Sequence, residues 1–446
     1  MIFSLDVRRA RKGDCLLLHY GSAQDPRLVM IDGGPRGVYG PHLKPRIEEI
    51  RKARGLDVSE PLPVDLLMVS HVDDDHIQGI LDLTKELLEA KRDRKPQCVQ
   101  VLSLWHNSFD EIIDHKPDEL TASVKHQFGP ASVTGSGELP DDEKAEVEEY
   151  FAGSTPGVPA EEESKLVSST LKVLASIEQG FQLRADAEAL EFERNPEFGG
   201  KLIIAAAGEA PLDMGQGLTV SIAGPMKGEV EALRKKHNQW LKKLKMEGKA
   251  PPQALAAYVD KSVPNLSSLV LLAEAKGKTM LLTGDARGDK ILQGLELVGL
   301  MKKGGKIRVG LLKVPHHGSA NNLNNDFFER IIAEHYVFSG NGEHGNPERK
   351  ALEMLFKARG DENYKIHLTY PVDEIDALRK EDWKKEQSKE KNKKKKDPDK
   401  KVRPNWSPAK HSLRSFFNAH EGLENKVKIA DAAKPHLINL LDRVTF

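Results

Sequence analysis

The segment from Val64 to Gly79 places the strongest constraint on how this chain can fold. An apolar run, Val64–Ser70, leads directly into a cluster of side chains that commonly bind metals, and a helical pattern follows at Ile77–Ala90. The cluster consists of two histidines and three aspartates: His71, Asp73, Asp74, Asp75 and His76. A strand that ends in such a cluster and continues into a helix is the way a metal-binding loop is built.

The spacing within the cluster is compatible with two metal ions. His71 and Asp73 are two residues apart and can point the same way from an extended loop, whereas Asp75 and His76 stand at a helix start, where adjacent side chains diverge. The alternative is an acidic helix N-cap, which would complement the helix dipole without any metal. Capping accounts for one carboxylate but does not account for two histidines that bracket three aspartates.

Short apolar runs rich in Val, Ile and Leu recur along the chain and are typical of buried strands. They are Ile2–Val7, Cys15–Tyr20, Leu28–Asp32, Val64–Ser70, Cys98–Trp105, Lys201–Ala206, Leu218–Gly224, Ser268–Glu274, Thr279–Gly284, Val309–Val314, Tyr336–Gly340 and Lys365–Tyr370. Helical patterns lie between them at Pro45–Arg54, Ile77–Ala90, Val230–Met246, Lys290–Met301, Asn325–Glu334 and Glu348–Ala358. So many strands require two packed sheets, and the interspersed helices predict an α/β layered domain.

The composition is that of an ordinary globular protein. Of 446 residues, 39% are hydrophobic and 30% are charged, with a formal net charge of -1, which excludes a collagenous or disordered chain. Two cysteines, Cys15 and Cys98, can build neither a disulfide framework nor a thiolate cluster. The N-terminus has the wrong charge order for a secretory signal, and no run approaches the roughly 18 apolar residues that cross a bilayer. We therefore expect a cytoplasmic protein without membrane contact.

The chain divides by composition into a main domain and a C-terminal extension. Residues 1–380 hold the strand and helix patterns, interrupted by expected helical insertions near 107–200 and 227–261 that could recognise a protein partner. Residues 381–446 are expected to form a Lys-rich linker and extension. Within them, Lys384–Lys401 has ten lysines against four acidic residues, an excess of 10 − 4 = +6. We interpret this run as a solvated loop or flexible linker, with nucleic-acid contact as the alternative.

Residues 71–76 resemble the His-x-His-x-Asp-His signature of the metallo-β-lactamase superfamily, in a His-x-Asp-x-Asp-His variant. This variant is similar to the hydrolase domain of ComEC-type competence proteins and to phosphocholine esterases of the same fold. The resemblance covers residues 1–105 and 201–375 and implies a metallo-β-lactamase αββα sandwich with helical insertions. It makes His71 and Asp73 ligands of one metal, and Asp75 and His76 ligands of the other. Because Asp73 replaces a histidine and hardens the ligand set, manganese is as plausible as zinc.

Three further segments extend the resemblance. Asp32, in Leu28–Gly34, matches the aspartate that orients the metal loop without binding metal. Asp285, after Leu281–Gly284, matches the carboxylate that bridges both metals. Taken alone, each of these two aspartates is also typical of a turn, because Asp next to Gly is common in turns. His316 and His317 match a late histidine ligand; one would bind metal and the other would face substrate, with His316 slightly favoured as the ligand.

Two positions depart from the family pattern. The middle histidine ligand is best represented by His106, with His126 and His237 as poorer choices and a surface histidine as the alternative. In this region ComEC-type domains tend to carry a histidine directly before a proline. In this chain Asn346 precedes the proline, and His344 lies two residues earlier. His344 remains a candidate for stabilising charge or donating a proton.

These residues allow metal-dependent hydrolysis, with a phosphodiesterase as the leading hypothesis. Two divalent ions about 3.5–4 Å apart would share a bridging hydroxide that attacks a nucleic-acid or small phosphodiester substrate. Asp75, His317 and His344 are the candidate catalytic side chains. The alternatives are a thioester, lactone or lactam hydrolase, and a metal-stabilised regulatory or partner-binding module. An intact ligand set argues against the last of these.

Overall fold

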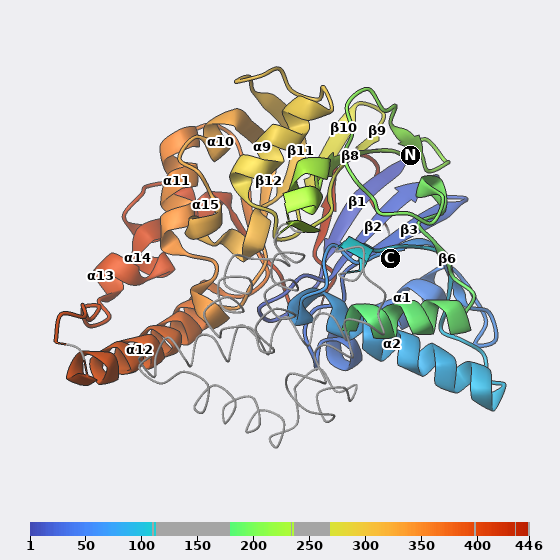
Figure 1. The fold of residues 1–446 in the computed structure, drawn as a ribbon, viewed down its shortest axis with the longest axis horizontal. Helices are drawn as coiled ribbons and strands as arrows, with labels where there is room; N and C mark the ends of the chain where they lie inside the picture. Colours follow the sequence, from blue (N-terminus) through green and yellow to red (C-terminus); the bar gives the residue numbers. More distant parts are fainter. Residues whose placement is uncertain are drawn as a thin grey trace.

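The structure is a computed structural model, and it describes residues 1–108, 111–112, 179–232, 234–235, 268–396, 398–432 and 434–444. Two mixed β-sheets pack face to face, and helices cover the outer face of each (Figure 1). The predicted α/β class and the prediction of two packed sheets are therefore confirmed. Within the described residues, no helix is both long and apolar enough to cross a bilayer.

The first sheet has the strand order β15-β1-β2-β3-β4-β5-β6. Its strands are β1 (Ile2–Val7), β2 (Leu16–Gly21), β3 (Pro26–Ile31), β4 (Leu62–Met68), β5 (Val99–Trp105), β6 (Glu193–Arg194) and β15 (Leu437–Asn439). Strands β1 to β3 are antiparallel, whereas β3, β4 and β5 are parallel. Helices α1 (Lys44–Ala53) and α2 (Asp74–Asp93) make the two parallel crossovers, because parallel neighbours need a long connection.

The second sheet has the order β14-β13-β12-β11-β10-β9-β8-β7 and repeats this arrangement. Its strands are β7 (Leu212–Asp213), β8 (Thr219–Gly224), β9 (Val270–Ala275), β10 (Lys278–Leu282), β11 (Ile307–Lys313), β12 (Ile331–Phe338), β13 (Lys365–Leu368) and β14 (Val427–Ile429). Its helices are α9 (Gly288–Leu297), α10 (Phe327–Arg330), α11 (Arg349–Arg359), α12 (Val372–Lys396), α13 (Pro408–His411), α14 (Leu413–Asn418) and α15 (Leu423–Lys426). Short helical turns occupy Tyr39–Leu43, Pro196–Phe198, Pro315–Gly318, Ala320–Asn322 and Glu343–Gly345.

The core has three apolar layers. One lies between the sheets and includes Phe3, Leu5, Leu18, Leu271 and Leu311. A second lies under α1 and α2, and a third lies under α9, α10 and α11. The sequence of a strand that is covered on both faces is a continuous apolar run rather than an alternating one. Each fully buried aliphatic side chain contributes roughly 1.5–3 kcal/mol to the stability of the fold.

Two predicted elements are wrong. The helix expected at Asn325–Glu334 is shortened to α10, because β12 begins at Ile331 and pairs in parallel with β11. The strand expected at Lys201–Ala206 does not form; only an isolated bridge joins Ala205 to Met226. The Asn107 side chain satisfies both backbone groups of Ile203, with N···O distances of 2.8 Å, and so replaces a neighbouring strand.

The Lys-rich run is also structured differently from the expectation. It is helical as far as Lys396, because α12 continues through it, and the expected boundary at residues 380 and 381 falls inside this helix. Lysine has a high helix propensity, and acidic residues lie in the first turn of α12, where they complement the dipole. Beyond the expected boundary, β14 pairs with β13 and β15 pairs with β1, so the extension completes both sheets.

The expected insertions are described only in part. Residues 179–189 are helical, and β6 follows them and joins the first sheet. Most of the remaining sequence of both insertions lies outside the described residues.

Three histidines form a row that ties the edges of the sheets together. His335 Nδ1 and His367 Nε2 are 2.9 Å apart, and His367 Nδ1 and His436 Nε2 are also 2.9 Å apart. The backbone oxygen of His436 accepts from the amide of Val7, which belongs to β1. Burial lowers the pKa of His335 to about 4 and that of His367 to about 2, with nearby lysines acting in the same direction. The row is therefore neutral at pH 7.

We predict that His367→Gln flattens the acid side of the stability profile. An unfolded histidine takes up a proton near pH 6.5, whereas folded His367 resists it, so folding stability is lost as the pH falls from about 6.5 toward the folded pKa. Each proton involved contributes a slope of about 1.4 kcal/mol per pH unit. Denaturant unfolding at pH 8 and pH 5 measures this, and the pH 8 value isolates the packing loss. If the free energies of unfolding of the unmodified protein and of His367→Gln differed by the same amount at pH 8 and pH 5, the prediction would be contradicted.

Candidate metal centre

The predicted ligands gather where strands of both sheets end. The loops after β4 and β10 carry the histidine–aspartate cluster and Asp285, and the turn after β11 carries His316 and His317. The amide of Leu269 donates to the carbonyl of Ser70 at 2.8 Å and joins the two sheets at this edge. Gly284 has φ +48°, and a Cβ there would lie 3.1 Å from the Ser70 side chain. Glycine thus lets the two metal-facing loops approach each other.

His76 is held between two carboxylates in the buried site. Its Nδ1 lies 2.7 Å from Asp32 Oδ2, and its Nε2 lies 3.3 Å from Asp285 Oδ1. Asp32 also accepts from the amide of Ser70 at 2.7 Å and from its hydroxyl at 2.6 Å. Asp32 therefore lies behind the metal loop and orients His76, as a partner of a metal-binding histidine does.

His317 has a corresponding arrangement from the second sheet. Its Nδ1 lies 3.0 Å from Ser339 Oγ and 3.4 Å from Asp14 Oδ1, and its Nε2 lies 3.5 Å from Asp285 Oδ1. His317 and its neighbour His316 have φ values of 53° and 49°. The left-handed region costs about 1–3 kcal/mol for each such residue, and strain of this kind is found at functional sites.

His71 completes the set of rings. Its Nε2 lies 3.8 Å from Asp285 Oδ2 and 3.8 Å from Asp73 Oδ2, while its Nδ1 lies 3.3 Å from Ser70 Oγ. The ring centroids of His71 and His76 are 3.9 Å apart. His316 Nδ1 also lies 3.6 Å from Asp285 Oδ2, so four imidazoles lie within 3.8 Å of the Asp285 carboxylate.

Five buried atoms in this cluster have no hydrogen-bond partner within the described residues. They are Nε2 of His71, His76 and His317, and Oδ1 of Asp14 and Asp285. Buried polar atoms are nearly always paired, so five unpaired atoms in one cluster are unusual. Their types and burial fit a divalent cation: two groups, Asp14 with His76, Asp285 and His317, and His71 with Asp75 and His76, have ligand atoms close enough to hold one.

Asp14 belongs to this cluster but was not among the residues predicted from the sequence. It lies on the Nδ1 side of His76 and His317, at 3.9 and 3.4 Å, and forms a buried ion pair with Lys313. The ammonium group would repel a cation there, and both Nδ1 atoms have other partners, so Asp14 orients the rings while Nε2 faces the metal. A Cβ at Gly13 would lie 1.9 Å from the carbonyl oxygen of Asp75. The Gly-Asp pair before an apolar strand was the available signal.

The remaining members of the cluster lie nearer its mouth. The side chains of Asp73 and Asp75 are 28% and 23% exposed. Asp73 stands at the N-cap of α2 but makes no capping hydrogen bond, so the capping alternative does not explain its position. His316 is 29% exposed and accepts from the Asn322 amide at 2.9 Å through Nδ1. The structure thus places His317 in a candidate metal group, whereas His316 lies at the more exposed side of the cluster with its Nδ1 3.6 Å from Asp285 Oδ2.

Other predicted histidines lie outside this group. His106 is buried, with the backbone of Gly180 beside its ring, and burial together with Arg194 and Arg184 lowers its pKa to about 3. His344 is exposed on the loop Glu343–Gly345, where its charge acts on Asp382 of α12. His126 and His237 lie outside the described residues.

The charges of the metal-free site oppose one another strongly. Burial works against a charge on His317, but Asp285 and Asp14 raise its pKa to about 9. Burial also opposes the charge on His76, yet Asp285 and Asp32 raise its pKa well above the usual value. Burial and His76 lower the pKa of His71 to about 3. Two histidines therefore hold protons that a metal ion must displace.

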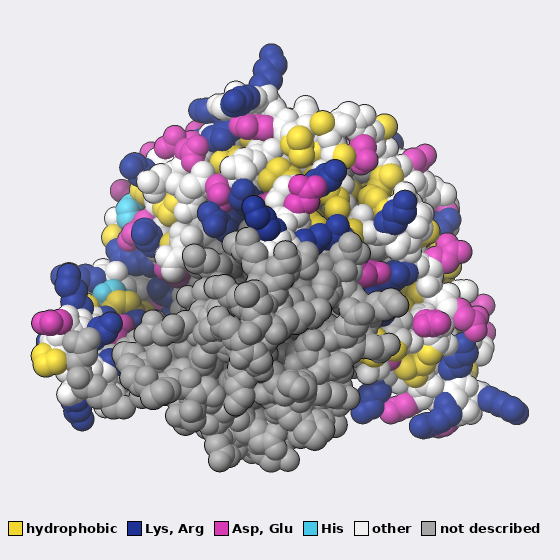
Figure 2. Space-filling view, in the orientation of Figure 1, with side chains coloured by type: hydrophobic (Ala, Val, Ile, Leu, Met, Phe, Trp, Pro, Cys, Tyr) yellow, Lys and Arg dark blue, Asp and Glu magenta, His cyan; other side chains and the backbone are white. Residues whose placement is uncertain are grey.

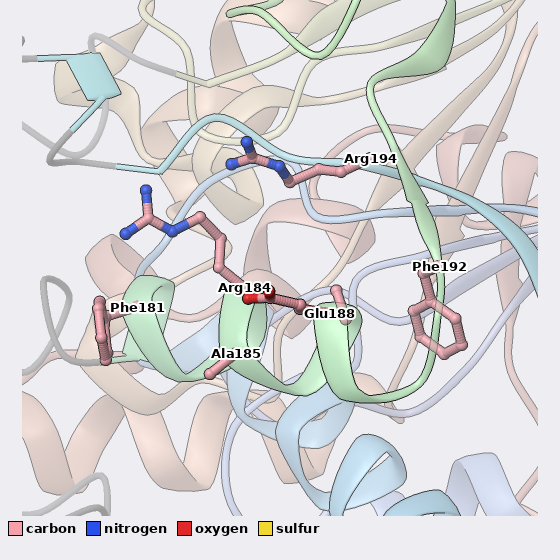
Figure 3. Close-up of a pocket in the computed structure, with 7 residues that line it drawn as sticks. Phe181, Arg184, Ala185, Glu188, Phe192 and Arg194 are labelled. Carbon is pink, nitrogen blue, oxygen red and sulfur yellow. The ribbon is translucent and has the colours of Figure 1, made fainter.

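A separate pocket of about 450 Å³ is lined by residues of the helical segment 179–189 and by Phe192 and Arg194 (Figure 3). Gln179, in the same helical segment, donates to Asp74 at 3.4 Å. Figure 3 shows the side chains of Arg184 and Arg194 extending to the same side. Arg194 pairs with Glu111 at 2.6 Å and Arg184 lies 3.8 Å from it. This carboxylate offsets the positive charge, so the pocket is not an evident anion site.

Comparison with known proteins assigns no family. No family model matches the chain. The chain is 30% identical over 138 residues to microtubule-associated protein 1A of Rattus norvegicus. This match covers 30% of the chain and 5% of that protein.

We predict that His317→Gln removes more metal affinity than His316→Gln. The first change deletes an Nε2 that faces Asp285 and should weaken binding by more than the roughly 10–100-fold typical of an outer partner. The second alters a ring that is 29% exposed and should cost less than about tenfold on the same scale. Calorimetric titration of metal-stripped protein with Zn²⁺ or Mn²⁺ measures both. A larger loss for His316→Gln would reverse the assignment.

We also predict that metal affinity rises with pH between 6 and 9. Because His76 and His317 have raised pKa values in the metal-free protein, binding must release their protons, and release becomes easier as the pH approaches the folded pKa. Titrations in two buffers with different ionisation heats give the number of protons released. A binding heat that does not depend on the buffer would show that metal binding releases no protons from these rings.

Proposed function

We propose that this protein is a metal-dependent hydrolase of the metallo-β-lactamase type, acting as a phosphodiesterase. The observation that carries the proposal is the convergence of unpaired buried nitrogens and a carboxylate from two sheets on one point. Two further features support it: the helix–sheet–sheet–helix layering, and the His-x-Asp-x-Asp-His motif at the end of β4. A site that needed no metal would have no reason to keep these atoms without partners.

The residues divide into holding, orienting and substrate-facing groups. His71, His76, His317 and Asp285 would hold divalent ions, with Asp75 beside them. When bound, such ions activate water and neutralise charge that grows on a phosphoryl oxygen. Asp32 and Asp14 fix the ring orientations through Nδ1.

A hydrogen-bond donor for the substrate stands at the mouth of the site. Asn322 donates to His316 Nδ1, so the neutral ring carries its proton on Nε2. His316 is the most exposed of the site histidines, and burial lowers its pKa, which keeps it neutral near pH 7. We assign His316 Nε2 as the atom that donates a hydrogen bond to the substrate oxygen.

A phosphodiester is the substrate class that this site suits best. The pair of partly exposed aspartates at the mouth adds carboxylate oxygens to the ligand set, which favours hard ions such as Mn²⁺. The motif itself is similar to those of hydrolases that act on phosphodiesters. Thioester, lactone and lactam hydrolysis need the same kind of metal centre and serve as comparison substrates.

We expect the protein to hydrolyse bis(p-nitrophenyl) phosphate with Mn²⁺ or Zn²⁺. Chelation should abolish turnover, and added metal should restore it. Asp285→Asn should lower kcat by about 100-fold or more, because loss of a metal-facing carboxylate should exceed the roughly 10–100-fold effect typical of an outer partner. Asp361→Asn, at an exposed aspartate in the turn between α11 and β13, is the matched control and should retain full activity.

The comparison substrates separate the alternatives. Metal-dependent cleavage of a thioester without cleavage of any phosphodiester would replace the proposed substrate class. Tight metal binding with no hydrolysis of either substrate would support a regulatory or partner-binding module instead.

A further inference from the structure

The second half of α12 presents a row of lysines that the metal centre does not use. Lys380, Lys384, Lys391 and Lys395 are all exposed, and spacings of four, seven and four residues place them on one side of the helix. With a rise of 1.5 Å per residue, this lysine row is about 22 Å long. Within the described part of the chain, none of the four forms an ion pair.

Two carboxylates beside the row are held by other partners: Glu386 pairs with Lys389 at 2.7 Å, and Glu390 pairs with Arg403 at 2.8 Å. Counting Glu381 and Asp382 as well, residues 380–395 hold eight lysines against four acidic residues, so an excess of 8 − 4 = +4 remains along the helix. Lys and Arg side chains gather at the left-hand edge of the space-filling view, where α12 lies (Figure 2).

The helix that bears the row is held rigidly. The Gln387 amide donates to the carbonyl of Arg403 at 2.9 Å, and the Trp383 indole donates to the carbonyl of Pro404 at 2.9 Å. The rings of Trp383 and Trp406 pack edge to face, with centroids 5.9 Å apart. Because these contacts fix the helix, little further ordering is needed when a ligand binds the lysines.

The row begins at the rim of the metal centre. Arg379 donates to the carbonyl of Gly345 at 3.0 Å, and the next residue, Asn346, donates to the carbonyl of His316 at 3.4 Å. Lys380 follows Arg379 directly, and α12 then runs outward from this point (Figure 1). A long anion seated in the metal centre could therefore continue along the lysine row.

We propose that the lysine row binds the phosphate backbone of single-stranded nucleic acid and leads the strand to the metal centre. This inference rests on the proposed phosphodiesterase function. Lysine ammonium groups contact phosphates as point charges and read no base sequence. A single strand is required because Asp285 is only 2% exposed, so the broad body of a duplex would be held away from it.

An anionic membrane fits this surface less well. A helix that lies in a membrane interface needs an apolar face to insert between headgroups. The large exposed hydrophobic side chains of the described residues are Val58, Leu102, Phe181, Leu297 and Ile429, and none of them belongs to α12. The row therefore offers positive charge but no apolar face that could insert into a membrane. This favours the phosphate backbone of a dissolved nucleic acid as the ligand.

The test measures binding of a fluorescently labelled 20-nucleotide single-stranded DNA, and RNA of equal length, by fluorescence anisotropy. Full-length protein is used in EDTA at several KCl concentrations, so hydrolysis does not interfere. The triple variant Lys384→Gln, Lys391→Gln and Lys395→Gln should lower the slope of log K against log salt by about 2, because each lysine that neutralises a phosphate adds roughly 0.7 to that slope. The control triple variant, Lys52→Gln, Lys302→Gln and Lys357→Gln, makes the same charge change at exposed lysines elsewhere.

The outcomes separate this inference from the proposed function. Equal affinity and salt slope in the two triple variants would overturn the inference, as would binding to anionic phosphatidylserine vesicles but not to oligonucleotides. Turnover of bis(p-nitrophenyl) phosphate with added Mn²⁺ should be unchanged by the row variant, since the small ester does not reach α12. Row-dependent oligonucleotide binding without hydrolysis of any phosphodiester would overturn the proposed function while supporting the row.

Discussion

The contact between the buried carboxylate of Asp285 and the four imidazole rings within 3.8 Å of it is the interaction on which the rest of the site depends. A carboxylate in this position must be neutralised, and in the metal-free protein the protonated rings of His76 and His317 supply that charge. The same rings turn Nε2 inward because Asp32 and Ser339 hold their Nδ1 atoms. A metal ion would replace the protons without rearranging the rings, since each ring is already oriented from behind.

Assembly of this site requires both sheets. Asp32 and the metal loop come from the first sheet, whereas Asp285 and His317 come from the second. The close approach at Gly284 brings the two loops together, and the apolar layer between the sheets fixes their distance. Site geometry is thus tied to the core, because a shift of either sheet would separate Asp285 from its rings.

Much of this arrangement could be predicted because the ligands follow apolar runs. The motif after β4 and Asp285 after β10 stand at the ends of strands, where sequence patterns locate them directly. Asp14 could not be found in this way, since it precedes an antiparallel strand and is positioned by contacts distant in sequence, including the bond from its amide to the carbonyl of Asp75 at 3.2 Å. The choice between His316 and His317 depends on a left-handed turn, which the sequence does not specify. Similarly, Ile331 begins a strand because β11 lies beside it, although its local pattern also suits a helix.

The most direct test of the account is the position of a bound metal ion in a crystal of the protein soaked in Mn²⁺. An anomalous difference map locates the ion without assumptions about the ligands. The account predicts density on the Nε2 side of His76 and His317, against the carboxylate of Asp285. Density on the Nδ1 side, beside Asp14 and Lys313, or no density in the cluster at saturating Mn²⁺, would contradict it.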